Sequence, residues 1–119
     1  MEPQPLEDAD KIREDIKVLL PDVKTFQKDA TGNKKYGGDI LLALISRMKT
    51  ALDIDEAWEG RIRYWSISTK LVDLPNSAYL IPISEGIEVN GWLLKEGWFV
   101  QVNGVPVVGA GTMLIFAPH

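Results

Sequence analysis

Glycines in the C-terminal half restrict the fold of this chain more than any other feature. An apolar stretch with few charges is cut into short segments by Gly86, Gly91, Gly97, Gly104, Gly109 and Gly111. Short apolar runs bounded by turn residues are typical of β-strands. The expected strands cover residues 87–89, 92–95, 98–102, 105–108 and 112–116.

Two Asn-Gly pairs, at 90–91 and 103–104, lie between these segments. Asn-Gly is favoured in the type I′ turn that joins antiparallel strands, because both central residues need a positive φ. Glu96-Gly97 predicts a further tight turn or a bulge. The pattern therefore predicts a meander of consecutive strands. Strands this short need a second layer to be stable.

Two more strands are predicted ahead of the glycine-rich stretch. Residues 61–72 and 77–84 are rich in β-branched and aromatic residues, and a turn at Leu74-Pro75-Asn76 separates them. Pro82 has no N–H for a ladder, so we expect its strand at a sheet edge or at a bulge.

The first helix is predicted after a loose arm. Residues 1–7 hold two prolines and little apolar surface. Asp8 or Asp10 is expected to cap the helix, and Pro21 to end or kink it. Its apolar stripe consists of Ile12, Ile16, Leu19 and Leu20.

The second helix is predicted to begin after a cap at Asp39. Ile40 and Leu42 make its first turns apolar nearly all round, so we expect it to be the central helix. Asp53 and Glu56 have the spacing of a capping box, which favours a short third helix, or a continuation of the second, ending at Gly60. The apolar face of the second helix consists of Leu41, Leu44, Ile45, Met48 and Leu52.

These elements predict an α+β fold. Two or three N-terminal helices would pack on a C-terminal, mainly antiparallel β-meander or small barrel. A chain of 119 residues suits one domain. We divide it into a flexible arm (1–7), a helical part (8–60) and a β part (61–119).

Charge is concentrated in the first half. Residues 61–119 carry 8 of the 30 charged residues and are neutral overall, so the first half carries the whole net charge of −4. The apolar β part has to cover its surface with the helices, a partner or copies of itself. A net negative charge argues against general nucleic-acid binding. An acidic N-terminus and the lack of a long apolar run predict a cytoplasmic protein without a membrane segment.

No residue combination identifies a catalytic, metal or cofactor site. The chain has no cysteine, and its single histidine is the terminal His119. Asp53, Asp55 and Glu56 could share a cation, but a capping box accounts for two of them. A pairing of Asp73 with Glu85 or Glu88 for acid–base chemistry has no support from their spacing.

One segment is locally basic. Residues 23–38 hold Lys24, Lys28, Lys34 and Lys35, with Gly37-Gly38 just before the second helix. Lys28, Lys34 and Lys35 could contact an anion, and a small regulator could bind its target there. The alternative is a solvated loop or short hairpin. Likewise Arg61 and Arg63, with the aromatic pair 64–65, could bind single-stranded nucleic acid or form a solvated strand face.

The stretch "GWFVQVNGVPVVGAGTMLIFAPH" resembles the strand–turn–strand rhythm of cupins over residues 86–119. That resemblance implies a small barrel or jelly roll. Cupins carry their first two histidine ligands at positions that fall here on Trp92 and Leu94, which bind no metal. The resemblance therefore implies no metal site, and no cupin residue role is transferred.

The function predicted from these features is a non-enzymatic structural or assembly module. It would form a homo-oligomer or dock into a larger complex, as a small virion neck, tail or capsid-associated protein does, and a phage-encoded chain would then be in the virion. The alternative is a cupin-like barrel that binds a small ligand between Trp65, Tyr79 and Trp98. The predicted interface residues are Trp92, Trp98, Leu94, Val100, Val105 and Val107.

Overall fold

A computed structural model describes residues 2–72 and 77–118 of the chain. It contains two α-helices, α1 (Asp10–Leu19) and α2 (Asp39–Ala51), and short 3₁₀ turns flank α1 on both sides. The first strands are β1 (Gln4–Pro5), β2 (Thr25–Lys28), β3 (Lys34–Tyr36), β4 (Trp58–Trp65) and β5 (Thr69–Lys70). The others are β6 (Ser77–Pro82), β7 (Ile87–Val89), β8 (Trp92–Leu94), β9 (Trp98–Asn103), β10 (Val107–Val108) and β11 (Gly111–Pro118).

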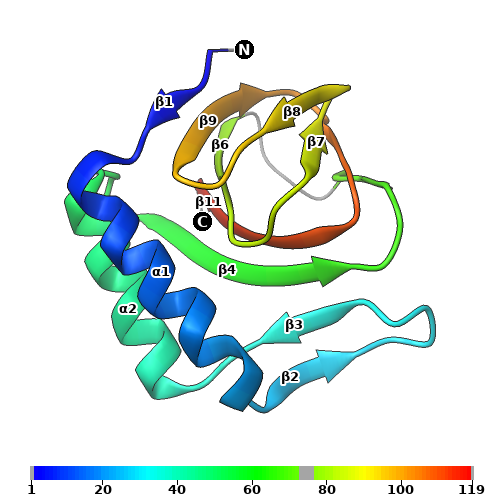
Figure 1. Ribbon diagram of the computed structural model, residues 1–119, viewed down its shortest axis with the longest axis horizontal. Helices are drawn as coiled ribbons and strands as arrows, with labels where there is room; N and C mark the ends of the chain where they lie inside the picture. Colours follow the sequence, from blue (N-terminus) through cyan, green and yellow to red (C-terminus); the bar gives the residue numbers. More distant parts are fainter. Residues whose placement is uncertain (1, 73–76, 119) are drawn as a thin grey trace.

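The strands form two sheets. The larger has seven strands in the order β1-β9-β6-β11-β4-β3-β2, and the smaller has four in the order β5-β10-β7-β8. Every strand pair between described residues is antiparallel. The predicted α+β class with an antiparallel β part is therefore confirmed. Figure 1 shows both helices side by side, away from the short strands β7 and β8.

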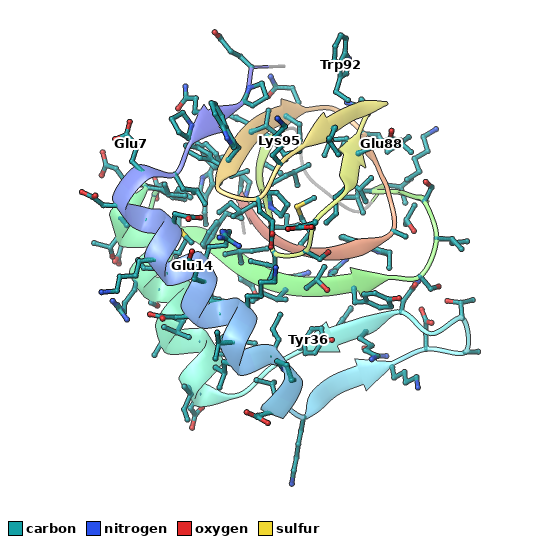
Figure 2. The ribbon with its side chains drawn as sticks, viewed as in Figure 1. Glu7, Glu14, Tyr36, Glu88, Trp92 and Lys95 are labelled. Carbon is teal, nitrogen blue, oxygen red and sulfur yellow. The ribbon has the colours of Figure 1, made fainter. Side chains whose placement is uncertain are left out.

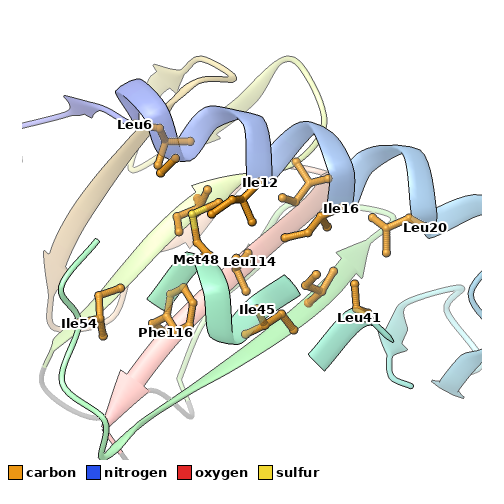
Figure 3. Close-up of a cluster of buried hydrophobic side chains, with 14 residues drawn as sticks. Leu6, Ile12, Ile16, Leu20, Leu41, Ile45, Met48, Ile54, Leu114 and Phe116 are labelled. Carbon is orange, nitrogen blue, oxygen red and sulfur yellow. The ribbon is translucent and has the colours of Figure 1, made fainter. Parts of the chain in front are cut away.

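The helices cover one face of the seven-stranded sheet. Figure 3 shows their apolar side chains packed on Leu114 and Phe116 of β11. The predicted stripes largely supply this core, because Ile12, Ile16 and Leu20 of the first stripe are buried. From α2 the buried side chains are Leu41, Ile45 and Met48.

Two expectations about the helices are wrong. Neither helix has a side-chain cap: the N-cap positions are Ala9 and Gly38, and Asp10 instead bonds Arg13. Helix α2 is also not central, because Ile40 and Leu42 are exposed on its outer side. A single sheet beneath the helix can bury only one of its faces.

The four-stranded sheet covers the opposite face of the larger sheet. Strand β11 shows the division, because Leu114 and Phe116 point to the helices while Met113 and Ile115 point to the small sheet. All four side chains are buried, as expected of a strand covered on both faces. The chain thus builds two separate cores, one on each face of a shared sheet.

Gly60 brings α2 close to the sheet. A Cβ atom on Gly60 would lie 2.4 Å from Ile45 Cγ2 and 2.5 Å from a ring carbon of Phe116. The residue lies inside β4, which begins at Trp58, and α2 ends at Ala51, so neither the predicted third helix nor the predicted continuation of the second is found. Asp53 has a positive φ, and Asp55 accepts a hydrogen bond from the Ala57 N–H, so this segment is a turn.

Each predicted strand segment contains a strand, but residues 61–72 are divided between β4 and β5, which lie in different sheets, and the predicted meander is not found. Asn90-Gly91 forms a hairpin turn between β7 and β8, with a positive φ at both residues. Asn103-Gly104 instead leads from β9 in the large sheet to β10 in the small one. Gly97 likewise joins strands of different sheets. The glycine turns therefore move the chain between layers.

Strands also occur outside the predicted β part. Residues 25–36 form the hairpin β2–β3, which was one of the two expectations for this basic segment. The expected loose arm pairs with β9 at Gln4 and Pro5, and Leu6 is buried. Strand β6 is internal, and Pro82 is its last residue, beyond the part that pairs with β9. Its missing N–H therefore interrupts no ladder on that side.

Candidate functional site

Among the side chains whose exposure the structure describes, the most exposed large aromatic one lies at one end of the small sheet. Trp92 is 72% exposed and Leu93 is 55% exposed, and both belong to β8, the edge strand of that sheet. Trp98, 40% exposed, begins β9 nearby. Figure 2 shows Trp92 at the tip of the β7–β8 hairpin, pointing away from the rest of the molecule.

A hollow of about 270 Å³ lies beside these residues. We call this region the β8 edge and define it by Trp92 and the lining residues of the hollow. They are Pro3, Leu93, Leu94, Lys95 and Trp98.

An ionic cluster holds the turn that leads from β8 to β9. Glu96 accepts from Arg13 Nη1 at 3.1 Å and from Lys17 Nζ at 2.7 Å, both on α1. Arg13 is only 6% exposed and also bonds Asp10. This hydrogen bond and the neighbouring carboxylates outweigh burial and raise the pKa of Arg13, so it stays charged. The turn next to the β8 edge is therefore tied to α1.

The six predicted interface residues do not form one surface. Leu94 and Val100 are core residues, because they pair with Ile87 and Leu80 and face the space between the sheets. Both are buried, since alternation along a covered strand places every second side chain inside.

Val105 and Val107 are exposed, but Val107 lies on β10, and β7 separates that strand from β8. Of the predicted interface residues, Trp92, Trp98 and the buried Leu94 thus belong to the β8 edge, and only the two tryptophans are exposed there. Leu93 and Pro3 were missed. An apolar residue between Trp92 and Leu94 was the available signal for Leu93, because a strand covered on one face exposes its middle residue.

The structure brings the two basic segments of the sequence together. Lys35 of β3 lies directly opposite Arg63 of β4, and Lys34 lies opposite Tyr64. Lys34 Nζ is 5.5 Å from the centroid of the Tyr64 ring, a cation–π contact. Lys28 lies opposite Lys34 on the edge strand β2, where lysine commonly blocks unwanted strand pairing.

The other predicted sites are not assembled. Trp65 and Tyr79 pack in different cores, on opposite faces of the large sheet, so they do not line one pocket with Trp98. Within residues 2–72 and 77–118, no group of three or more acidic or histidine side chains is placed to hold a metal. Asp73, His119 and the 74–76 turn lie outside the described residues.

Protein-family models, curated proteins and solved structures were compared with this chain, and none matches it. Among the described residues, no helix has the length and apolar character needed to cross a membrane.

Proposed function

We propose that this protein is a non-enzymatic structural module that self-associates through the β8 edge. The observation that supports this is the exposure of Trp92 and Leu93 on an edge strand, while both cores are complete without them. Large aromatic residues are enriched at protein interfaces and depleted on free surfaces. A small component of a virion neck, tail or capsid would use such a module.

A second copy of the chain is the proposed occupant. An edge strand offers unpaired N–H and C=O groups, and two β8 strands related by a two-fold axis can pair antiparallel. Each four-stranded sheet would then continue into the other. The axis would place the apolar side chains of Trp92 and Leu93 against those of the other copy.

Charge also favours self-pairing at this edge. Lys95 next to β8 and Glu88 on β7 are exposed and carry opposite charges. Figure 2 labels both beside the same hairpin. Glu88 lies opposite Leu93, so in a two-fold pair of β8 strands it would lie on the same face as Lys95 of the other copy, and the two charges would not repel.

The test is the native mass measured by light scattering over a range of concentrations. We expect a dimer for the natural chain and a monomer for Leu93→Lys, which adds a charge at the centre of the proposed interface. Ile67→Lys is the matched control, since Ile67 is also an exposed aliphatic residue but lies between β4 and β5. A monomeric natural chain, or a dimer that survives Leu93→Lys, would contradict the proposal.

A further inference from the structure

The backbone of Leu93 faces the open side of the small sheet. Leu93 lies opposite Glu88 in the β7–β8 hairpin. The Glu88 carbonyl accepts a hydrogen bond from the Gly109 N–H at 2.7 Å, so it points away from β8. Glu88 and Leu93 therefore form a non-hydrogen-bonded pair, and the N–H and C=O of Leu93 point away from β7. Within the described residues, no strand pairs with β8 on that side.

This direction sets the register in which two copies can pair. The register that pairs the whole of β8 places the two-fold axis beside Leu93, and each Leu93 then donates its N–H to the Leu93 carbonyl of the other copy. Trp92 of one copy would lie opposite Leu94 of the other. Because residues directly opposite each other share a face of the sheet, the Trp92 side chain would lie on the face of that Leu94.

That face is the inner one, which is turned toward the large sheet. Leu94 is buried between the two sheets, and Trp92 lies two residues before it on the same strand. Val89, the cross-strand neighbour of Trp92, is buried there as well. Trp92 itself is exposed because it lies at the tip of the hairpin, beyond the core (Figure 2). An exposed side chain changes rotamer rapidly, so its ring can turn toward a second copy.

The hollow of the β8 edge lies between the edges of the two sheets. Its lining residues come from β8 and the position after it, from β9 and from the N-terminal arm. Trp98 of β9 shares the face of Val100, which packs on the small-sheet side, and Pro3 of the arm lines the hollow beside it. Ligand pockets usually enclose about 300–1,000 Å³, so a hollow of about 270 Å³ suits one large side chain better than a free ligand.

We propose that this hollow receives the Trp92 side chain of a second copy. The inference rests on the pairing of β8 strands proposed above, and it names the side chain that fills the hollow. In that pairing, Trp92 lies beside the end of the other β8 strand where Leu94, Lys95 and the hollow are found. Trp92 of the same copy does not line the hollow. The two-fold axis makes the interface symmetric, so both hollows are filled in the same way.

The lining of the hollow suits an indole ring. Trp98 offers an aromatic face, and aromatic pairs attract each other in offset or edge-to-face arrangements. Lys95 adds an ammonium group, which is attracted to the face of an aromatic ring. Pro3 adds a rigid apolar surface. A tryptophan that leaves water for such a site is the kind of residue that dominates the binding energy of an interface.

The first experiment measures the dissociation constant of the dimer by light scattering over a dilution series. Trp92→Ala should weaken the dimer about thirtyfold or more, as expected of a residue that dominates an interface. Trp98→Ala should weaken it too, and the double variant should dissociate no more readily than Trp92→Ala alone, because either change removes the same contact. Val107→Ala is the matched control, since Val107 is exposed on β10, away from β8, and should leave the constant unchanged.

The second experiment follows Trp92 without removing it. The chain has four tryptophans, and with 5-fluorotryptophan at all of them, the ¹⁹F resonance of Trp92 is assigned by its loss in Trp92→Phe. The shift of this resonance between H₂O and D₂O reports its contact with solvent. We expect that shift to shrink as the dimer forms, whereas the shift of Trp65 should stay small throughout because Trp65 is already buried.

The outcomes separate this inference from the proposed function. A dimer that Leu93→Lys dissociates but Trp92→Ala leaves intact would keep the pairing of β8 strands and overturn the insertion of Trp92. Additive losses in the double variant, or a Trp92 resonance that stays in contact with solvent in the dimer, would also overturn it. A natural chain that is monomeric at every concentration would overturn both.

Discussion

The two faces of the seven-stranded sheet are covered in different ways. On one face, two helices supply apolar side chains at helical spacing and meet the sheet along Leu114 and Phe116. On the other, the small sheet is assembled from four short strands that come from separate parts of the chain. The helices are held on their face of the large sheet by side-chain packing. The small sheet also needs turns and cross-strand pairs to hold its own strands together.

The difference has a consequence for function. A helix satisfies its own backbone hydrogen bonds, so the helical cover exposes no backbone edge. A four-stranded sheet has two edges, and one of them is β8 with Trp92 and Leu93 exposed. We therefore propose that the side of the molecule built from strands, and not the helical side, pairs with another chain.

Truncation of Phe116, in the core between the helices and the large sheet, is expected to cause the largest loss of stability. Its side chain is fully buried between the sheet and α2, so Phe116→Ala should reduce the free energy of unfolding by about 3–5 kcal/mol. Met113→Ala makes the matched change on the other face, with an expected cost of about 2–5 kcal/mol.

Because β11 belongs to both cores, each variant should still unfold in one transition by denaturant titration. Two separate transitions in either variant would show that the cores unfold independently.

Gly60→Ala tests how closely α2 must approach the sheet. The added methyl group would overlap Ile45 and Phe116, and we expect a loss of about 1–3 kcal/mol from overpacking. Gly104→Ala is the control on the strand side. Its φ is +84°, but its Cβ would meet no atom within 4 Å.

Thermal unfolding of the two glycine variants separates overlap from backbone strain. Both substitutions should lower Tm, and the Tm of Gly60→Ala should be lower than that of Gly104→Ala. The reverse order would mean that α2 can shift to accept the methyl group.

The ionic cluster between α1 and the β8–β9 turn links the two faces. Glu96→Ala removes an acceptor from the buried Arg13 and should cost about 1–3 kcal/mol in urea unfolding. Lys17→Ala removes only the more exposed partner of Glu96, and we expect less than about 1 kcal/mol. Equal effects would indicate that Arg13 contributes packing and not charge.

Local structure could be predicted from the sequence where the apolar residues follow one clear pattern. The stripe containing Ile12 and Ile16 and the short apolar run in residues 112–116 gave the correct elements. The Asn90-Gly91 hairpin was also predictable, because its turn chemistry is self-contained. The identical pair at Asn103-Gly104 forms no hairpin, since the next strand, Val107–Val108, pairs with β5 and β7.

Sheet order is not encoded in spacing, because each pairing depends on the whole set of competing strands. The same limit applies to the candidate sites. Leu94 and Val100 have the composition of interface residues, but burial depends on the layer that lies opposite them. The pairing of Lys35 with Arg63 likewise needs the β2–β3 hairpin to join β4. Trp92 was predictable because it directly follows a turn.

The smallest effect is expected from a change at Asp29 in the turn of the β2–β3 hairpin. It should alter hydrogen exchange only at the amides of that turn. The Thr31 hydroxyl donates a hydrogen bond to the Asp29 carboxylate, and the N–H groups of Asn33 and Thr31 donate two more. These hydrogen bonds lower the pKa of Asp29. A lowered pKa in the folded state means that ionised Asp29 stabilises the turn above the usual carboxyl pKa. This stabilisation is lost as the pH falls through the lowered value.

Asp29→Ala should therefore speed amide hydrogen exchange at Thr31 and Asn33 near neutral pH, while exchange in β11 stays unchanged. The difference between the variant and the natural chain should shrink in acid, once the carboxyl of the natural chain is protonated. A difference that persists below that pH would mean that the ionised carboxylate is not what holds the turn. The bond between Asn33 and Ser66 would then be the contact that holds the turn against the end of β4.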